Sequence, residues 1–250
     1  MRREEFLHEI NDYLEISAYS DRSINGLQVA GSDKIEKVAT AVSASEKTIC
    51  EAVSLGVDAL LVHHGLFWQG DSYVVDRAKK RKLEQLFHAN INLIAYHIPL
   101  DAHQEIGNNW KAARDLNWSD LQPFGEYKGR HIGVSGAVES IHIADLQSQV
   151  GNYYNHQPHS ALGGPDYVSR VALISGGAHW QIIDAIKADM DVFITGSFDE
   201  PIWNIAHEEG IHFLAFGHAA TERIGPRALA DYITQQFTLE SHFIEDTNPF

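Results

Sequence analysis

Six residues with metal-binding side chains stand at or just after the ends of apolar runs in this sequence. They are His63, His64, His97, Asp101, His218 and Glu222. Imidazole nitrogens and carboxylate oxygens bind divalent transition metals in proteins. His218 and Glu222 are four residues apart, so on a helix their side chains would share one face. A carboxylate in that place can present one oxygen to each of two ions.

Without His97, the set offers three nitrogen donors and two carboxylates. Divided over two ions, these donors leave coordination positions open for water, as in catalytic sites rather than structural ones. The residue types suit zinc, iron, manganese, nickel or cobalt and do not choose among them. The cofactor that we expect is therefore a pair of divalent ions of undetermined identity. A solvated ion pair between His218 and Glu222 is the alternative when that pair is taken alone.

The adjacent pair His63 and His64 raises a geometric question. Neighbouring side chains on a strand point to opposite faces, so both imidazoles cannot serve one site while the backbone stays extended. Gly65 follows them and marks the point where the strand is expected to stop. We expect the two histidines to leave the strand there and to bind two ions side by side.

An internal duplication predicts how the chain brings these residues together. Residues 38–65 align without a gap with residues 171–198, and residues 91–102 align with residues 211–222. Each half reads as strand, helix, strand, helix, strand, which implies parallel strands with right-handed crossovers. The second helix of each half is expected at 76–88 and at 201–207. Ligands of open parallel sheets lie at the carboxyl ends of the strands, where the candidate residues stand.

Composition limits the classes of protein that remain. The chain has 250 residues, a formal net charge of -15 and a single cysteine. The charge makes nucleic acid an unlikely partner, and one cysteine excludes an internal disulfide or a cysteine-based zinc site. The N-terminal residues lack the apolar stretch of a signal peptide, and no segment has the ~20 apolar residues of a membrane span. We expect a cytoplasmic protein without membrane contact.

Several segments together resemble a known family, the YbgI-type or NIF-three-like dinuclear metal-centre proteins, whose members are often labelled GTP cyclohydrolase type 2 homologues. The segments are NGLQVAG, LLVHHGLFW, YHIPLDAH, FITGSFDE and FGHAATER. The resemblance implies an α/β fold with two similar lobes that face each other across a metal-containing cleft, assembled into a ring-shaped homohexamer. It also implies a dinuclear site in which Glu222 is the bridge. The implied ligands are His63, His64, Asp101, His218 and Glu222.

We expect the first lobe at residues 1–125 and the second at 126–250. Within the second lobe, residues 126–165 lack the strand-helix period and are expected to form a less regular insertion. The C-terminal segment is expected to be able to pack back on the first lobe.

Ser197 marks a departure from the family pattern. Many relatives carry an acidic residue directly after the TG of this strand end, and here that residue is a serine. The function of the acid could have moved to Asp199 or Glu200, or these two residues simply begin a helix with favourable first-turn charge.

The expected function is that of a dinuclear metal-dependent hydrolase acting on a nucleotide or related small metabolite, with GTP cyclohydrolase-type ring opening suggested by the family label. His97 is the candidate catalytic residue, either as a proton shuttle or as a residue that orients the substrate. The turn Ser175–Ala178 is a candidate anion cradle, although tight packing also explains its glycines. The alternative function is a non-catalytic, ring-shaped metal-binding scaffold that binds a partner.

Overall fold

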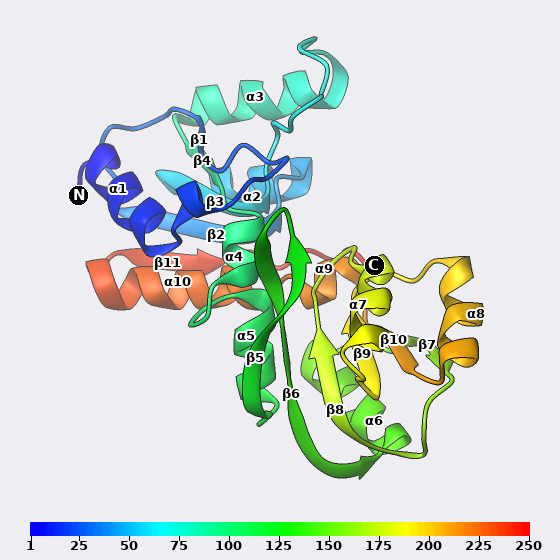
Figure 1. Ribbon diagram of the computed structural model, residues 1–250. Coiled ribbons are helices and arrows are strands. Elements are labelled where there is room, and N and C mark those ends of the chain that lie inside the picture. Colours follow the sequence, from blue (N-terminus) through cyan, green and yellow to red (C-terminus); the bar gives the residue numbers. More distant parts are fainter. The chain divides into compact units, whose positions relative to one another are not determined.

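The computed structural model describes residues 1–250 and contains two β-sheets, each in its own compact unit (Figure 1). Unit 1 consists of residues 1–100 and 225–247, and unit 2 of residues 101–224 and 248–250. Both units combine a mixed sheet with helices, which confirms the expected α/β class. No helix combines the length and apolar character needed to cross a membrane.

The sheet of unit 1 has five strands in the order β1-β4-β3-β2-β11. The strands are β1 (Gly26–Val29), β2 (Lys37–Ser43), β3 (Ala59–His64), β4 (Asn92–Ala95) and β11 (Glu240–Phe243). All neighbours pair in parallel except β1, which runs antiparallel to β4 at the sheet edge. Gly26 begins β1 with a φ of +93°, a value that favours glycine.

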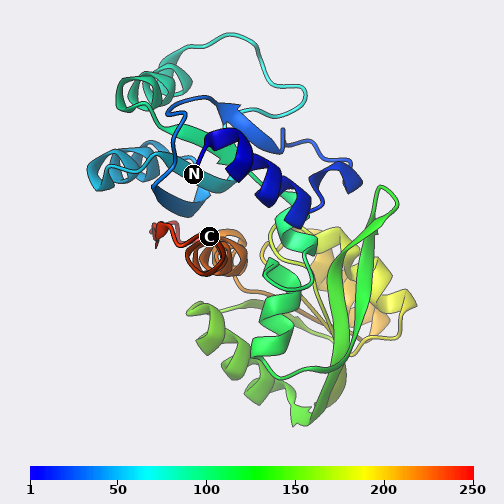
Figure 2. The same ribbon diagram turned by 90° about the vertical axis from the view of Figure 1, so that its left-hand side faces the viewer.

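Helices cover both faces of this sheet. They are α1 (Arg3–Tyr13), α2 (Glu46–Leu55), α3 (Arg77–Ala89) and α10 (Ile224–Phe237), with a 3-10 helix at Ile16–Ala18. Ala39 and Ala41 of β2 pack into the core shared with α2 and α3. Thr40 between them donates a hydrogen bond to the carbonyl of Pro226 in α10, 2.8 Å away. The alternation therefore places α10, orange-red in Figure 2, on the opposite face from α2 and α3.

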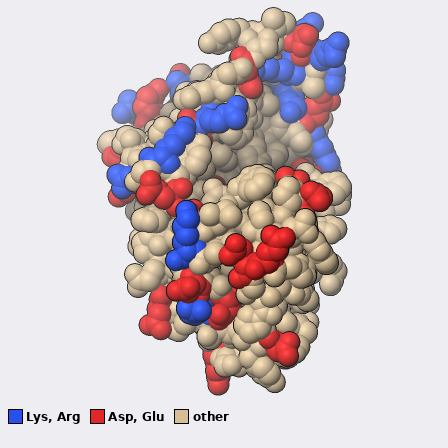
Figure 3. Space-filling view, turned by 45° about the vertical axis from the view of Figure 1, so that its right-hand side comes forward, with Lys and Arg blue, Asp and Glu red and all other residues tan.

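Helix α3 concentrates positive charge in a chain that is acidic as a whole. Arg81 pairs with Glu46 at 2.5 Å, and Lys80 pairs with Glu84 at 3.6 Å. Figure 3 shows Lys and Arg side chains next to Asp and Glu side chains over the upper part of the view. The positive charge of this helix is therefore partly neutralised at the surface.

The sheet of unit 2 has six strands in the order β5-β6-β8-β9-β10-β7. The strands are β5 (Ser119–Tyr127), β6 (Arg130–His142), β7 (His159–Leu162), β8 (Tyr167–Leu173), β9 (Val192–Thr195) and β10 (His212–Ala215). Strands β8, β9 and β10 are parallel, whereas β5 and β6 form an antiparallel hairpin and β7 is an antiparallel edge strand.

The helices of unit 2 again lie on both faces of the sheet. They are α5 (Asn108–Asp115), α6 (Ile143–Tyr154), α7 (Ile182–Lys187), α8 (Glu200–Glu209) and α9 (His218–Thr221), with a 3-10 helix, η2, at His179–Gln181. Helices α5 and α6 share one apolar core with alternate residues of β8, β9 and β10. A short helix, α4 (Ile98–Ala102), contains the boundary between the two units.

The two aligned segments form the same elements and the same contacts. The strand order β2-β3-β4 and the order β8-β9-β10 are both parallel, and α3 and α8 occur where helices are expected. A carboxylate oxygen of Asp58 accepts from the backbone N–H groups of Glu36 and Lys37. The equivalent oxygen of Asp191 accepts from Ser169 and Arg170. The parallel strands are confirmed, and common ancestry of the halves stays a prediction.

The compact units divide the chain at 100/101 rather than at 125/126. The expected boundary lies inside β5, which pairs with β6 on both sides of that point and so belongs wholly to unit 2. Residues 126–165 contain β6, α6 and β7, all of which join the sheet or the core. This segment is therefore regular, because it extends the parallel sheet with antiparallel strands that a strand-helix period does not reveal.

Candidate functional site

Unit 1 brings three imidazoles together at the carboxyl ends of neighbouring strands. His63 and His64 are the last residues of β3, and His97 is the second residue after β4. One nitrogen of each ring lies within 4.8 Å of a nitrogen of the other two. The ring centroids of His63 and His64 are 4.7 Å apart, and those of His63 and His97 are 4.9 Å apart. This cluster satisfies the expectation that the strand ends gather these side chains.

Each of the three imidazoles is anchored through Nδ1. The anchoring atoms are Tyr96 O for His63 at 3.0 Å, Ser43 Oγ for His64 at 3.1 Å and Asp21 Oδ1 for His97 at 2.9 Å. A histidine held through one ring nitrogen binds a metal or a proton through the other. The anchors thus make Nε2 the atom that each ring can offer.

The backbone of His63 and His64 does not leave the strand, contrary to expectation. The N–H of Tyr96 donates to Val62 O, and the N–H of Ala44 donates to His64 O at 2.9 Å. These bonds hold β3 in the sheet through its last residue. Strand β3 nevertheless ends there, and the two ring centroids lie close together despite the adjacent positions.

Gly65 ends the strand because it permits a close approach. A Cβ atom on Gly65 would lie 2.3 Å from Oε1 of Gln28. That oxygen accepts hydrogen bonds from the N–H groups of Leu66 and Phe67, at 2.7 and 3.2 Å. Gln28 on β1 therefore turns the chain immediately after the histidine pair.

Unit 2 brings together one imidazole and two carboxylates. Nε2 of His218 lies 3.2 Å from Oε1 of Glu222, whose side chain is 4% exposed. A carboxylate oxygen of Asp101 lies within 4.8 Å of one of Glu222. Two acids this close and this buried favour bound cations as partners, because a buried carboxylate requires compensation.

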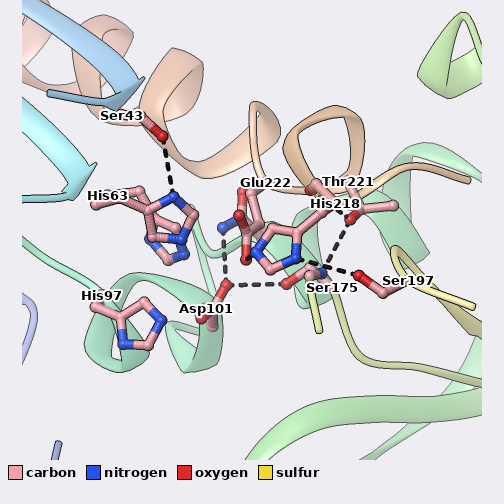
Figure 4. A network of polar contacts seen from close by, with 12 residues as sticks. Ser43, His63, His97, Asp101, Ser175, Ser197, His218, Thr221 and Glu222 are labelled. Carbon is pink, nitrogen blue, oxygen red and sulfur yellow. Dashed lines mark hydrogen bonds and ion pairs between the residues drawn. The ribbon is translucent and has the colours of Figure 1, made fainter. Parts of the chain in front are cut away.

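Asp101 and His218 are anchored by neighbouring polar side chains, as Figure 4 shows. Oδ1 of Asp101 accepts from Asn108 Nδ2 and from Ser175 Oγ, both at 2.9 Å. Nδ1 of His218 lies 3.2 Å from Ser197 Oγ. Ser197 therefore anchors the imidazole of His218, although it replaces the acid expected from the family pattern.

Gly176 provides the room that Glu222 occupies. Its φ is +66°, and a Cβ atom there would lie 2.0 Å from Oε1 of Glu222. The backbone N–H groups of Ser175 and Gly176 donate to Asn109 Oδ1 and Thr221 Oγ1, at 2.7 and 3.0 Å. The prediction that these backbone N–H groups bind an anion is therefore wrong for Ser175 and Gly176, because both groups already donate to protein side chains.

Asp21 is the residue that sequence reasoning missed. Both of its oxygens lie near Nδ1 of His97, at 2.9 and 3.1 Å. Burial opposes ionisation, but the hydrogen bond and charge of His97, aided by Asn25 and the N–H of Ser23, hold the pKa of Asp21 well below its usual range. The pattern Asp-x-Ser-x-Asn is typical of a turn and was the only local signal.

The donors of each unit, taken separately, are of types that bind divalent transition metals. Unit 1 supplies imidazole nitrogens, and unit 2 supplies an imidazole nitrogen and carboxylate oxygens. This mixture of borderline nitrogen ligands and hard oxygen ligands fits the metals that the sequence suggested. The space kept by Gly176 beside Glu222 is further evidence that the acid is held in a defined position.

Comparisons with known proteins agree with this fold. The family model Duf34/NIF3 (NGG1p interacting factor 3) matches residues 1–249, and the chain belongs to this family. A protein of Chlamydia muridarum named GTP cyclohydrolase 1 type 2 homolog is 46% identical over 248 residues, 98% of each chain. A protein of Escherichia coli K12 with the same name is 38% identical over the whole of both chains.

Solved structures extend the comparison. A protein called ybgI superposes with a TM-score of 0.93 at 38% identity, and both chains are covered completely. TTHA1606 from Thermus thermophilus superposes with a TM-score of 0.92 at 35% identity, again over both whole chains. Reduced HcgD from Methanocaldococcus jannaschii shares the fold with a TM-score of 0.87 at 23% identity, over 98% of each chain.

Proposed function

We propose that this protein is a dinuclear metal-dependent hydrolase that acts on a nucleotide or related small metabolite. The ligands to one pair of divalent ions are His63, His64, Asp101, His218 and Glu222, with Glu222 as the bridge. The observation that carries the proposal is the anchoring of these side chains. Three imidazoles are held through Nδ1 and Asp101 through Oδ1, so that the remaining donor atoms are oriented before a metal binds.

The ions supply Lewis acidity, which activates water and stabilises negative charge on a substrate oxygen at neutral pH. The protein's own contribution is to hold the ligands and to keep the acids buried. Glu222 is 3% exposed and Asp101 6% exposed, so their charges act at low effective dielectric. Zinc, iron, manganese, nickel and cobalt all fit the donors.

His97 is the candidate for proton transfer. It lies beside His63 and His64, with ring centroids 4.9 and 5.7 Å away, and it is anchored by a carboxylate rather than by a hydroxyl or carbonyl. In Ser-His-Asp triads, a buried carboxylate likewise orients the imidazole that transfers the proton. The alternative role for His97 is to orient the substrate.

The names of the relatives support a nucleotide as substrate. GTP cyclohydrolase-type chemistry opens the imidazole ring of guanine and releases formate, and a dinuclear hydrolase is suited to such a hydrolytic step. The curated relatives are called homologs of that enzyme. We further propose that the chain assembles into a ring-shaped homohexamer, which light scattering behind a sizing column would test by giving six times the chain mass of 27.9 kDa.

A non-catalytic metal-binding scaffold is the second candidate. The observation in its favour is that the backbone N–H groups of Ser175 and Gly176, which could have bound a triphosphate, donate to protein side chains. A scaffold needs metal and partners but no room for a phosphate group.

A metal count combined with a substrate screen separates the two candidates. The screen contains GTP, other nucleotides and cyclic amides. The hydrolase predicts about two ions per chain and turnover that His97→Ala abolishes while the metal content stays unchanged. His88→Ala, at an exposed histidine of α3 that is hydrogen-bonded only within its own helix, is the matched control. Full metal occupancy without hydrolysis of any compound would favour the scaffold.

A further inference from the structure

Asp21 is a buried acid outside the proposed ligand set. It is 6% exposed and lies in the loop before β1. Its Oδ1 accepts from the N–H of Ser23 at 3.0 Å, and its Oδ2 accepts from Asn25 Nδ2 and the N–H of Ile98, each at 3.0 Å. Three donors from protein groups thus fix the plane of the carboxylate before His97 is considered.

The loop that carries Asp21 is itself fastened to the segment after β3. Ser23 and Trp68 form an isolated antiparallel bridge. The N–H of Gln69 donates to Arg22 O at 2.7 Å on one side of that bridge. The loop that carries Asp21 is therefore held in place by backbone pairing that does not involve His97.

His97 is held at two points by this loop. Its Nδ1 lies 2.9 Å from Oδ1 of Asp21, and its backbone N–H donates to Asn25 Oδ1 at 2.8 Å. An ionised carboxylate can only accept hydrogen bonds, so Nδ1 must carry the proton of this bond. In the neutral ring Nε2 is then the acceptor. The ring of Trp68 packs edge-on at 5.0 Å and limits rotation of the imidazole.

We infer that Asp21 is a positioning residue that holds neutral His97 as the Nδ1–H tautomer, with Nε2 as its acceptor atom. The consequence for catalysis rests on the proposed function, whereas the tautomer itself does not. The competing role for Asp21 is purely structural. Its bond from Ser23, two residues on, closes a turn that needs no imidazole.

Asp21→Asn separates the two roles. If the new amide nitrogen replaced Oδ2, it would face three other donors, Asn25 Nδ2, the N–H of Ile98 and Nδ1 of His97. If it replaced Oδ1, it would face the N–H of Ser23 and Nδ1 of His97. His97 can relieve this second conflict by moving its proton to Nε2, so the variant should favour that tautomer.

Neutron diffraction from deuterium-exchanged crystals of the full chain locates the proton directly. The expected result is deuterium on Nδ1 of His97 in the wild type and on Nε2 in Asp21→Asn. The matched control is Asp58→Asn, because Asp58 also accepts backbone N–H groups in unit 1 but has no hydrogen bond to His97. That variant should keep the wild-type tautomer. Deuterium on Nε2 in the wild type would overturn the inference even if Asp21→Asn did not fold.

Kinetics supply the second readout on any compound that the wild type hydrolyses. Asp21→Asn should lower kcat by about 100-fold or more, the range expected for loss of a proton-transfer group, with KM changed little. Asp58→Asn should leave both constants unchanged. A purely structural role would instead leave the tautomer of His97 unaltered in Asp21→Asn and would refute the inference. If no compound is hydrolysed, the hydrolase proposal fails while the tautomer measurement still decides the role of Asp21.

Discussion

The hydroxyl of Ser197 lies 3.2 Å from Nδ1 of His218, and this bond orients the imidazole as Ser43 orients His64 at 3.1 Å. A hydroxyl polarises an imidazole less than a carboxylate does. All three proposed imidazole ligands are therefore held in place by neutral groups, since His63 is anchored by the carbonyl oxygen of Tyr96. His97, anchored by the carboxylate of Asp21, differs from them in this respect.

Removing the hydroxyl should weaken metal binding. Ser197→Ala removes the hydroxyl that holds Nδ1 of His218, and the loss of such an orienting group lowers metal affinity about 10-fold to 100-fold. Competition with a chromophoric chelator measures the affinity. Ser43→Ala should act in the same direction, whereas Ser54→Ala, which removes an exposed hydroxyl bonded within α2, should have no effect. An unchanged affinity in Ser197→Ala would show that His218 needs no anchor.

Replacing the serine by an acid should have the opposite effect. Ser197→Asp would place a carboxylate near Nδ1 of His218 and make this nitrogen ligand more basic. We expect tighter metal binding than in the wild type, measured by the same chelator competition. Weaker binding would mean that the longer side chain displaces the imidazole rather than supporting it.

The proposed bridge can be tested by counting ions. Glu222→Gln removes the charge that both ions share, so the metal content should fall from about two ions per chain to less than one. Elemental analysis after desalting provides the count. Glu208→Gln, at an exposed acid on α8, should retain both ions. Two retained ions in Glu222→Gln would exclude Glu222 as a required ligand.

A substitution at Gly176 tests whether metal binding depends on the position of Glu222. Gly176→Ala and Gly56→Ala both place a side chain at a φ near +65°, which costs about 1 kcal/mol in each case. Only Gly176→Ala also forces a Cβ atom against Glu222, since nothing lies within 4 Å of a Cβ atom at Gly56. Both variants should lose free energy of unfolding because of this backbone cost, which chemical denaturation of metal-free protein measures. Gly176→Ala alone should lose metal affinity, and equal affinity in both variants would contradict this account.

The lowered pKa of Asp191 predicts how the free energy of unfolding depends on pH. Burial opposes its ionisation, but the N–H groups of Ser169 and Arg170 and the charge of Arg170 outweigh this effect and lower its pKa. A lowered folded-state pKa gives stability that is complete above the unfolded value of about 3.9 and is lost as the pH falls toward the folded value. Between about pH 5 and pH 3, urea denaturation should therefore show a larger loss in the wild type than in Asp191→Asn. Equal losses would refute this prediction.

The alternation of strand and helix patterns in the sequence was sufficient to predict the parallel strands of both sheets. Apolar runs such as Leu60–Val62 and Val192–Ile194 are buried throughout, as parallel strands between helical layers must be. The antiparallel parts were harder to predict. Strand β6 begins with exposed Arg130 and His131 and carries mixed side chains along its length, so no single period identified it.

The proposed ligands were visible in the sequence because they stand at strand ends, where chemistry is expected. Most of the side chains that anchor them could not be identified from the sequence, because they lie far from their partners along the chain. Asp21 and His97 are 76 residues apart, and Ser43 and His64 are 21 apart. Serine and aspartate in loops are common, and only the register of the folded strands shows which of them meets an imidazole.

The path of the chain has a consequence for how this architecture can be taken apart. Residues 225–247 return to unit 1 after residues 101–224 of unit 2, and they supply the edge strand β11 and the helix α10, whose Pro226 carbonyl accepts a hydrogen bond from Thr40. In sequence, residues 101–224 of unit 2 are thus inserted between the two segments of unit 1. A fragment that ends at Leu100 would lack α10 and β11, and so would lose the helix on one face of the unit 1 sheet and its edge strand. Residues 101–224 of unit 2, in contrast, form one continuous stretch, to which only residues 248–250 are added, so this stretch is the fragment to express alone.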